Sequence, residues 1–580
     1  MAEVRIHTEE IDDIPLLFGF LQQMGIQETL DEIVNTHGNH KGLSMGWLTT
    51  AWLSYIVSEA DHRMVEVETW AEEHIQALSA LIPKAVDVKD FTDDRLADVL
   101  EWLSRDNVWE EVEVHLSQHL VQVYDLHQEP IRLDSTTASV YHDTEDNTLF
   151  RYGYSKDHRP DLPQFKVMLG TLDPMGMPMA TLVLPGNEAD DGLYIPTVIR
   201  ARQALGCGGH LYVGDSKMSA LDTRSFIQAG GDYYLTPLAQ VGDVPELMEE
   251  LLKPVWDKEQ PLELIYPPTD MKPGVDDEQV RPKAIALGYE TTRSQKAMLA
   301  NGQIEWEERI LVVYSPSLAR NGRRGLSRRL ANAEQSILAL TPPRGRGKRQ
   351  QNDLSALQAS VRTILKKRQV QGLLDVSYTC EREERSVRKY GSLPARTEER
   401  IRYVVQVSRN EQAISEVRRT LGWRLYVTSA PVHQLPLSRA VNVFRRAPVM
   451  ERNFARLKGR PLGIHPLYVR REDHVCGMVR LLSLALRVLT LVEHTARKNI
   501  QSSGERLSGL YSGNPKRQTA TPTTERLLKA FGSIHLNIVQ LPSQTIYHVT
   551  PLSDLQKRIL VLLNLSPSIY ETMESALDID

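Results

Sequence analysis

The sequence predicts an α/β protein in which a sheet of mixed direction follows an N-terminal helical region and is interrupted by a large inserted α+β region. Three observations predict this class. Residues 92–104, TDDRLADVLEWLS, carry apolar side chains at helical spacing. Residues 164–186 hold two strand-like segments on either side of DPMG, which is a turn sequence. Helix-like and strand-like segments then alternate through residues 194–237, as in βαβ units.

Length and composition exclude several classes of protein. A chain of 580 residues suggests about three or four folding units, and 41% hydrophobic with 25% charged residues is typical of a globular protein. The 3 cysteines are far apart, so we expect neither a disulfide framework nor a Cys-rich zinc site. The most apolar segment, residues 478–492, contains two arginines, and the N-terminus lacks the pattern of a secretion signal. We therefore expect no membrane span and a cytoplasmic location.

The charge is distributed unevenly along the chain. The net charge is −7, yet residues 1–128 contain 25 acidic and 7 basic residues, so the remainder carries a net charge of +11. Residues 317–370 contain 13 basic residues and only two acidic ones, Glu334 and Asp353. Such a stripe suits binding to a phosphate backbone, although a solvated helix face explains it equally well.

The pattern along the chain predicts five regions. Residues 1–128 are expected to form a helical domain, and residues 129–237 the first part of the sheet-containing core. Residues 238–434 interrupt the alternation with extended runs and basic helical segments, which indicates an inserted domain. The core is expected to resume over residues 435–500, which have strong helical patterns, and residues 501–580 are expected to form a linker and a small C-terminal segment.

Two aspartates are associated with predicted strands. Asp134 lies inside the segment IRLDSTT, and Asp215 ends the segment LYVGD. Ligands of open α/β sheets gather at the carboxyl ends of strands, and an aspartate within an apolar strand is costly to bury unless it is paired or bound to a metal. Each residue also has a structural explanation, because Asp134 can bond to Ser135 or Thr136 and Asp215 can cap the helix that follows it.

A third acid lies on a predicted helix, VMERNFARLKG. Glu451, Phe454 and Lys458 recur at spacings that place them on one helix face. A carboxylate, an aromatic ring and a cation would therefore point the same way. The structural explanation is a surface ion pair beside a core phenylalanine.

Two smaller patterns have structural explanations that we prefer. Cys207 and His210 form a single Cys-x2-His pair without a second pair, so they are expected to be loop residues and not zinc ligands. Asp190 and Asp191 could add to a metal cluster, but they precede a predicted helix and are expected to cap it.

Several ordered motifs together resemble a known family. They are LDSTT, the long segment from GYSKD to PGNEAD, LYVGDSKMSA, GWRLYVTSAP, and a Glu-x6-Lys segment followed by HPLYV. This series resembles the DDE transposases of bacterial insertion sequences, in the IS-four and IS-sixteen-thirty-four-like branch, over most of the chain. The resemblance implies an RNase H-like core with a large inserted α+β domain and an N-terminal helical domain. It also implies that Asp134, Asp215 and Glu451 are the catalytic acids and bind two Mg²⁺ ions, with Mn²⁺ as a substitute.

The third acid of that branch belongs to a Tyr-x2-Arg-x3-Glu-x6-Lys signature. Glu451 and Lys458 stand at the matching positions, whereas Phe444 and Ala447 replace the tyrosine and the arginine. Glu472 is a rival third acid, but only Glu451 has a lysine seven residues further along the chain.

The resemblance implies that the chain binds double-stranded DNA, both as the terminal inverted repeats of an element and as its target, and that it acts as a homodimer. The N-terminal domain would assist end recognition or dimer contacts, and the protein would work in the bacterial cytoplasm, associated with the nucleoid. Two sets of residues would contact DNA. They are Phe444, Arg445, Arg446 and Lys458 near the third acid, and Arg323, Arg324, Arg328, Arg329, Lys348 and Arg349 in the basic stripe.

The implied reaction begins with water attacking at the end of the element, and the freed 3′-OH then attacks target DNA. Two alternatives remain open. One is a catalytically inactive relic that binds element ends as a repressor, and the other is an RNase H-like nuclease.

Overall fold

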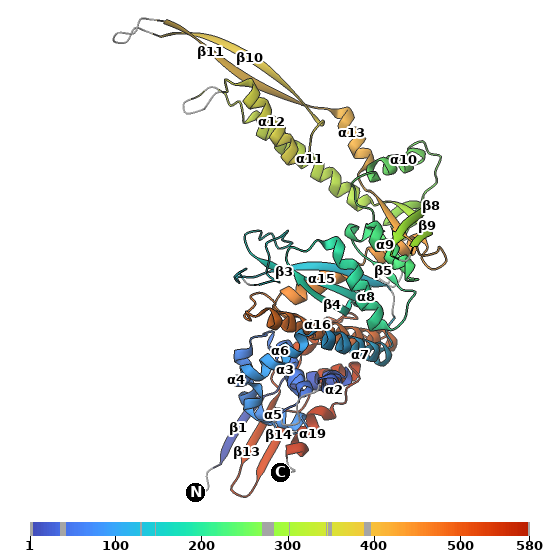
Figure 1. Cartoon of the computed structure of the whole chain (residues 1–580). Helices are drawn as coiled ribbons and strands as arrows, with labels where there is room; N and C mark the ends of the chain where they lie inside the picture. Colours follow the sequence, from blue (N-terminus) through green and yellow to red (C-terminus); the bar gives the residue numbers. More distant parts are fainter. Residues whose placement is uncertain are drawn as a thin grey trace.

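The computed structural model describes residues 4–34, 42–127, 130–145, 147–268, 283–300, 302–343, 345, 351–387 and 396–577. The protein is 47% helical and 22% strand, with one large mixed sheet, which confirms the predicted α/β class. Figure 1 shows an elongated molecule. The N-terminal helices and the C-terminal segment lie at one end, the large sheet lies in the middle, and a long arm projects from the other end.

The large sheet has nine strands in the order β4-β3-β2-β5-β6-β12-β9-β8-β7. β2 pairs with β5, and β5 with β6, in parallel, and all other neighbours are antiparallel. The strands are β2 (Ile131–Ser139), β3 (Gln164–Leu172), β4 (Met177–Pro185), β5 (Leu211–Val213), β6 (Tyr233–Pro237), β7 (Glu263–Ile265), β8 (Ala286–Leu299), β9 (Gly302–Tyr314) and β12 (Trp423–Thr428).

The predicted hairpin and crossovers are present in this sheet. β3 and β4 are joined by the DPMG turn, in which Gly176 has φ of +78°, a conformation that favours glycine. The helices α8 (Tyr194–Leu205) and α9 (Leu221–Ala229) connect β4, β5 and β6, as the alternating pattern predicted. A parallel neighbour can be reached only through such a crossover.

The N-terminal region consists mainly of helices, and α6 agrees with the prediction because its four periodic apolar residues, Leu96, Val99, Leu100 and Leu103, are buried. Thr92 is the N-cap residue of α6 but makes no side-chain capping bond. The helices are α1 (Ile14–Gln23), α2 (Ile26–Ile33), α3 (Met45–Glu59), α4 (Val67–Glu73), α5 (Ile75–Leu81), α6 (Asp93–Ser104) and α7 (Asp106–Tyr124), with short 3₁₀ turns η1 (Met64–Glu66) and η2 (Val88–Phe91).

The two ends of the described chain share a small sheet, and the sequence did not predict the pairing between them. β1 (Arg5–Glu10) pairs antiparallel with β13 (His535–Gln540), which also pairs with β14 (Thr545–Val549). The C-terminal helices are α17 (Thr524–Lys529), α18 (Asp554–Leu562) and α19 (Ser568–Leu577), and α19 packs on α1 and α5. The C-terminal segment therefore completes the N-terminal domain.

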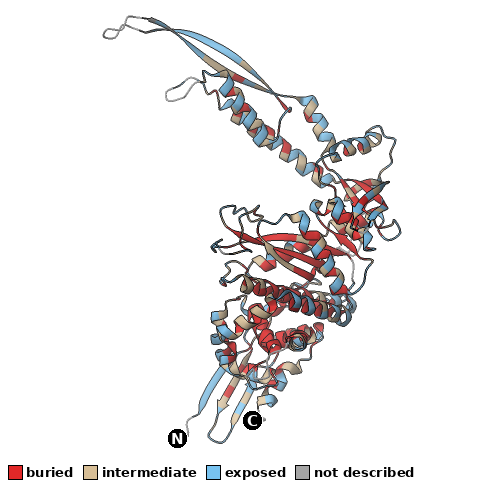
Figure 2. Cartoon of the chain, in the orientation of Figure 1, coloured by how far each residue is buried: buried red, intermediate tan, exposed pale blue. Residues whose placement is uncertain are grey.

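A long helix, α16 (Glu472–Ser503), runs between the N-terminal domain and the sheet, where it packs on α6 and β4. Of the described helices it is the one that is long and apolar enough to cross a membrane, and 94% of its most apolar window is buried inside the protein. Figure 2 shows it as mostly buried along its length. α16 is therefore explained as a core helix.

A long arm projects away from the large sheet (Figure 1). It comprises α11 (Pro316–Leu338), α12 (Leu354–Arg368), β10 (Leu374–Val387), β11 (Arg396–Arg409) and α13 (Glu411–Thr420). It has its own small core, which includes Leu330, Val361 and Ile414, while much of its remaining surface is exposed (Figure 2).

The predicted boundaries at 238 and 434 do not separate the arm from the core. β7, β8, β9 and β12 come from this range and extend the large sheet, and α10 (Val244–Trp256) packs near them. Beyond β12, α14 (Leu437–Phe444) and α15 (Pro448–Lys458) return the chain to the core. Sequence pattern alone could not distinguish strands that join an existing sheet from strands that form a new one.

Candidate active site

The first two predicted acids belong to neighbouring strands, with Asp134 in β2 and Asp215 two residues after the end of β5. β2 and β5 pair in parallel through Ile131 with Tyr212 and Arg132 with Val213. Asp134 and Asp215 each lie two residues beyond the second pair, so the register places them at the same level. The pairing ends at Arg132 while β2 continues to Ser139. The two aspartates therefore lie just beyond the paired stretch of β2 and β5, a position where open sheets bind ligands. We call this position the gap.

The structural explanations for these two aspartates also hold. Oδ1 of Asp134 accepts a hydrogen bond from Ser135 N at 2.8 Å. Oδ1 of Asp215 accepts from Lys217 N at 2.8 Å, as the cap of η4 (Ser216–Ser219), and from the Tyr194 hydroxyl at 2.7 Å. These bonds orient both carboxyl groups, and Asp215 remains exposed to solvent.

A third carboxylate reaches this gap, and it is Asp190. Its Oδ1 lies 2.5 Å from Lys166 Nζ, and its Oδ2 lies 3.7 Å from Lys156 Nζ. Lys156 Nζ lies 3.7 Å from Asp134 Oδ1 as well. The helix-cap interpretation of Asp190 is wrong, because Ala189 is the N-cap residue of η3 (Asp190–Leu193) and no side chain caps that turn.

The electrostatics of the gap reflect this crowding of acids. Burial raises the pKa of Asp134, Lys156 lowers it, and the nearby Asp215 and Asp190 raise it. Burial also acts to raise the pKa of Asp190, but Lys166, Lys156 and Lys217 outweigh burial and hold it below its usual value. Burial and the three neighbouring aspartates place the pKa of Tyr194 well above its usual value. A site that collects carboxylates in this way favours cations.

Glu451 lies on the helix face expected from its sequence, but the structure does not bring it into contact with the two aspartates. Arg132 lies two residues before Asp134, so the two side chains leave the same face of β2, and Arg132 Nη2 donates to Val443 O at the end of α14. α15 follows directly and contacts β2, which puts Glu451 on that face of the sheet. Its carboxylate is exposed, with no hydrogen bond or ion pair to any described residue.

Lys458 is linked to the acids by the loop that contains Lys156 and Asp157. Its Nζ is 2.6 Å from Asp157 Oδ1, and Asp157 is the neighbour of Lys156, which contacts Asp134 and Asp190. Glu451 is seven residues earlier on the same helix, about 10 Å along the axis. The loop therefore links the end of α15 to the gap between β2 and β5.

The other signature positions are used for packing. The Phe444 ring contacts Tyr426 edge-on, with ring centroids 4.8 Å apart. Arg445 Nη2 donates to Ile285 O at 2.9 Å and to Ser315 Oγ at 3.0 Å. Arg446 lines a cleft of about 740 Å³ together with Arg439 and His127. Of these three residues, Arg446 is the one whose side chain the structure leaves available for a ligand.

The predicted basic stripe lies on the arm. Arg323, Arg324 and Arg328 are exposed on α11, and Arg329 is half-buried and donates to Gln369 Oε1 at 3.4 Å. Lys348 and Arg349 lie outside the described residues. Residues 316–421 contain 23 Lys and Arg and 10 Asp and Glu, a net charge of +13 in a chain whose total is −7. The arm is thus the basic part of an otherwise acidic protein.

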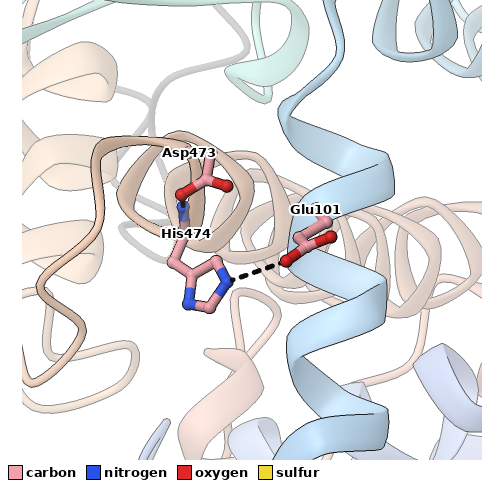
Figure 3. A group of neighbouring side chains, drawn as sticks. All are labelled: Glu101, Asp473 and His474. Atoms are coloured by element: carbon pink, nitrogen blue, oxygen red, sulfur yellow. Dashed lines mark hydrogen bonds and ion pairs between the residues drawn. The ribbon is translucent and has the colours of Figure 1, made fainter.

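Within the described residues, one group of three side chains has potential ligand atoms within 4.8 Å of one another, and it lies elsewhere. Figure 3 shows this group, Glu101 of α6 with Asp473 and His474 at the start of α16. Arg471 Nη2 already lies 2.9 Å from Glu101 Oε1 and 2.5 Å from Asp473 Oδ2. The group is therefore explained as an ion-pair network between two helices. The rival acid Glu472 accepts a hydrogen bond from Thr148 Oγ1 at 2.7 Å.

Cys207 and His210 lie in the loop between α8 and β5, where Cys207 Sγ and His210 Nε2 are 3.4 Å apart. Sequence reasoning missed Lys156 and Lys166 in the gap. Lys156 belongs to the motif GYSKD, which was quoted only for its resemblance, and Lys166 was one polar residue in an apolar strand.

The N-terminal region matches a known domain family. Residues 6–113 match a domain of unknown function, DUF4277, and this domain is found in transposase-like proteins. No curated protein matches the chain. The matched residues cover most of the N-terminal helical domain and none of the candidate active site.

Proposed function

We propose that the protein is a DDE transposase of a bacterial insertion sequence, with an RNase H-like core, that cuts element ends and joins their 3′-OH groups to target DNA. The observation that carries this proposal is the register that sets Asp134 beside Asp215 where β2 and β5 separate. Three consecutive antiparallel strands followed by two parallel strands support an RNase H-like core. The DUF4277 match supports the transposase class independently of the site.

The donor set fits Mg²⁺. Asp134 and Asp215 offer carboxylate oxygens, which hard divalent cations prefer, whereas Glu451, the third acid that the resemblance implies, would have to approach them to complete the set. Two bound divalent cations would stabilise the attacking and leaving oxygens of an in-line phosphoryl displacement. The chain itself would orient Asp215 through Tyr194 and Asp134 through the Ser135 amide. Lys458, whose Nζ bonds to Asp157 beside Lys156, would hold a DNA phosphate.

The charge distribution supports the proposed substrate and assembly. The arm, with its net charge of +13, suits a DNA backbone, whereas the N-terminal domain is acidic and suits dimer contacts better than unassisted DNA binding. One phosphodiester is exchanged for another during strand transfer, so the reaction needs no nucleotide hydrolysis, and the sequence has no GxxxxGK[ST] motif.

The test is a cleavage assay with the full-length protein and DNA that carries the element's ends. Wild-type protein is expected to nick this DNA in the presence of Mg²⁺, and Asp134→Asn is expected to abolish nicking. Asp161→Asn is the matched control, because Asp161 is exposed and pairs only with Arg159 among the described residues. Nicking that is indifferent to the end sequence would instead identify an RNase H-like nuclease.

A second candidate is a catalytically inactive relic that binds element ends. It is favoured by Phe444, which packs on Tyr426 at the signature tyrosine position, and by Glu451, whose carboxylate forms no group within 4.8 Å with the two aspartates. Specific DNA binding without nicking, equal in wild type and Asp134→Asn, would establish this candidate.

A further inference from the structure

Lys156 stands between two carboxylates that come from different parts of the chain. Its Nζ lies 3.7 Å from Asp134 Oδ1 on β2 and 3.7 Å from Asp190 Oδ2, just before α8. The same Nζ donates to Ser135 O at 2.6 Å and to Ser135 Oγ at 2.8 Å, and the Lys156 amide donates to Thr137 Oγ1 at 3.0 Å. The ammonium group is therefore held in place by four oxygen atoms, as a bound cation would be.

Asp190 is fixed in the gap by a second lysine. Lys166 is only 6% exposed, and its Nζ contacts Asp190 Oδ1 at 2.5 Å and Glu188 O at 2.6 Å. A buried ammonium needs such partners. Asp134 and Asp190 are thus held by two ammonium groups, of which Lys156 touches both acids, whereas Asp215 is held by the Tyr194 hydroxyl and the Lys217 amide.

We propose that Asp190 is a further metal ligand of this centre and that Lys156 is a built-in counter-ion, which occupies a cation position in the metal-free protein and leaves when a divalent cation binds. This inference rests on the proposed function for the existence of the metal centre. Mg²⁺ and an ammonium group compete for the same oxygens, because both are bound through the charge of the carboxylates. Lys156 therefore lowers the metal affinity that the acids would otherwise have.

The test measures Mn²⁺ binding to the full-length protein without DNA, by electron paramagnetic resonance of free Mn²⁺. Asp190→Asn is expected to weaken binding by at least about tenfold, since a ligand is removed while the shape is kept. Asp191→Asn is the matched control, because Asp191 is the adjacent exposed carboxylate, and its affinity is expected to remain that of the wild type.

A second variant tests the lysine separately. Lys156→Met is expected to tighten Mn²⁺ binding by about tenfold, because it removes the competing ammonium, and about tenfold corresponds to about 1.4 kcal/mol. Lys217→Met is its control, since Lys217 acts on Asp190 at longer range without bridging two acids, and a change of less than about threefold is expected.

The outcomes separate this inference from the proposed function. Equal Mn²⁺ affinity in wild type and Asp190→Asn, with binding abolished in Asp134→Asn, would overturn the role of Asp190 and leave the metal centre intact. Unchanged or weaker binding in Lys156→Met would overturn the counter-ion role. Absence of Mn²⁺ binding in both wild type and Lys156→Met, with folding verified by circular dichroism, would reject the metal centre and with it the proposed function.

Discussion

Arg487 of α16 and Glu113 of α7 form an ion pair inside the protein, with Nη2 and Oε1 3.7 Å apart and side chains that are 0% and 1% exposed. Glu113 also accepts hydrogen bonds from Thr181 N at 2.8 Å and from Arg200 Nη2 at 2.9 Å. One carboxylate thus joins the N-terminal domain, the long central helix, β4 and α8. Arg487 is one of the two arginines within the apolar segment 478–492. Its charge partner, Glu113, lies on α7 of the N-terminal domain.

Glu113→Gln is expected to destabilise the protein by about 3 to 5 kcal/mol, because Arg487 keeps its buried charge without its partner. Arg487→Met is expected to cost less, since Glu113 retains Arg200 and Thr181. The double variant is therefore expected to be more stable than Glu113→Gln alone. Urea denaturation gives all three values, and equal stability of Glu113→Gln and wild type would contradict the assignment.

Asp13 is expected to make stability fall as the pH rises. Burial raises the pKa of Asp13 from 3.8 to about 7, Ser58 opposes this, and Asp12 and Glu59 add to it. The folded protein therefore binds this proton more tightly than the unfolded chain. The resulting stability is fully present below pH 4 or so and is lost as the pH rises through about 7.

Asp13→Asn removes the ionisation and keeps an acceptor for the Ser58 hydroxyl, which lies 2.6 Å from Asp13 Oδ1. The variant is expected to exceed wild type in stability at pH 8 by up to about 4 kcal/mol, with a smaller difference at pH 5. Denaturation at the two pH values measures this difference. Asp125→Asn serves as the control, because the Asp125 side chain is 96% exposed, and a similar pH effect there would remove the support for Asp13.

Replacing either of two helical glycines by alanine is expected to change the stability of the protein, with opposite signs at the two positions. A Cβ atom at Gly477 of α16 would clash with the backbone carbonyl of Leu100, whereas a Cβ at Gly325 of α11 would meet nothing within 4 Å. Gly477→Ala is expected to cost about 1 to 3 kcal/mol through overpacking. Gly325→Ala is expected to stabilise α11 by about 0.5 to 1 kcal/mol through helix propensity.

Hydrogen exchange followed by mass spectrometry resolves the two glycine effects, since it reports each helix separately. Protection is expected to fall in α16 and α6 for the first variant and to rise in α11 for the second. A change in protection of the same sign for both variants would show that the close approach of α16 to α6 does not require glycine at position 477.

Under the proposed function, the arm is expected to contribute the salt dependence of DNA binding. Replacing Arg323, Arg324 and Arg328 by alanine removes three exposed charges, and the slope of log K against log salt concentration is expected to fall by about 0.9 for each phosphate that these arginines no longer neutralise. Arg409→Ala is the control, because Arg409 is paired with Glu334 at 2.6 Å. Fluorescence anisotropy at several salt concentrations measures the slope, and an unchanged slope in the triple variant would place DNA elsewhere.

The local elements could be predicted where a pattern is complete within a short segment. The apolar stripe of α6, the turn at Gly176 and the strand containing Asp134 depend on neighbouring residues, and all three are present in the structure. Asp134 and Asp215 could be selected as site residues for the same reason, because each belongs to a recognisable strand.

Features that depend on distant partners could not be predicted in this way. β1 forms a strand only because β13, some 530 residues later, supplies its hydrogen bonds. Asp190 looked like a helix cap, because nothing near it in sequence shows that Lys156 and Lys166 hold it in the gap.

Propensity and periodicity act over a few residues, so the order of amino acids was enough to specify the helices, the hairpin, the strand that carries Asp134 and the strand that Asp215 follows. Folding of the whole chain was needed to pair β2 with β5 in the register that aligns these aspartates. It was also needed to bring Arg487 to Glu113 and to leave Glu451 apart from the two aspartates. The physical reason is that charge pairing and strand register depend on which surfaces are packed together, and that packing is a property of the whole chain.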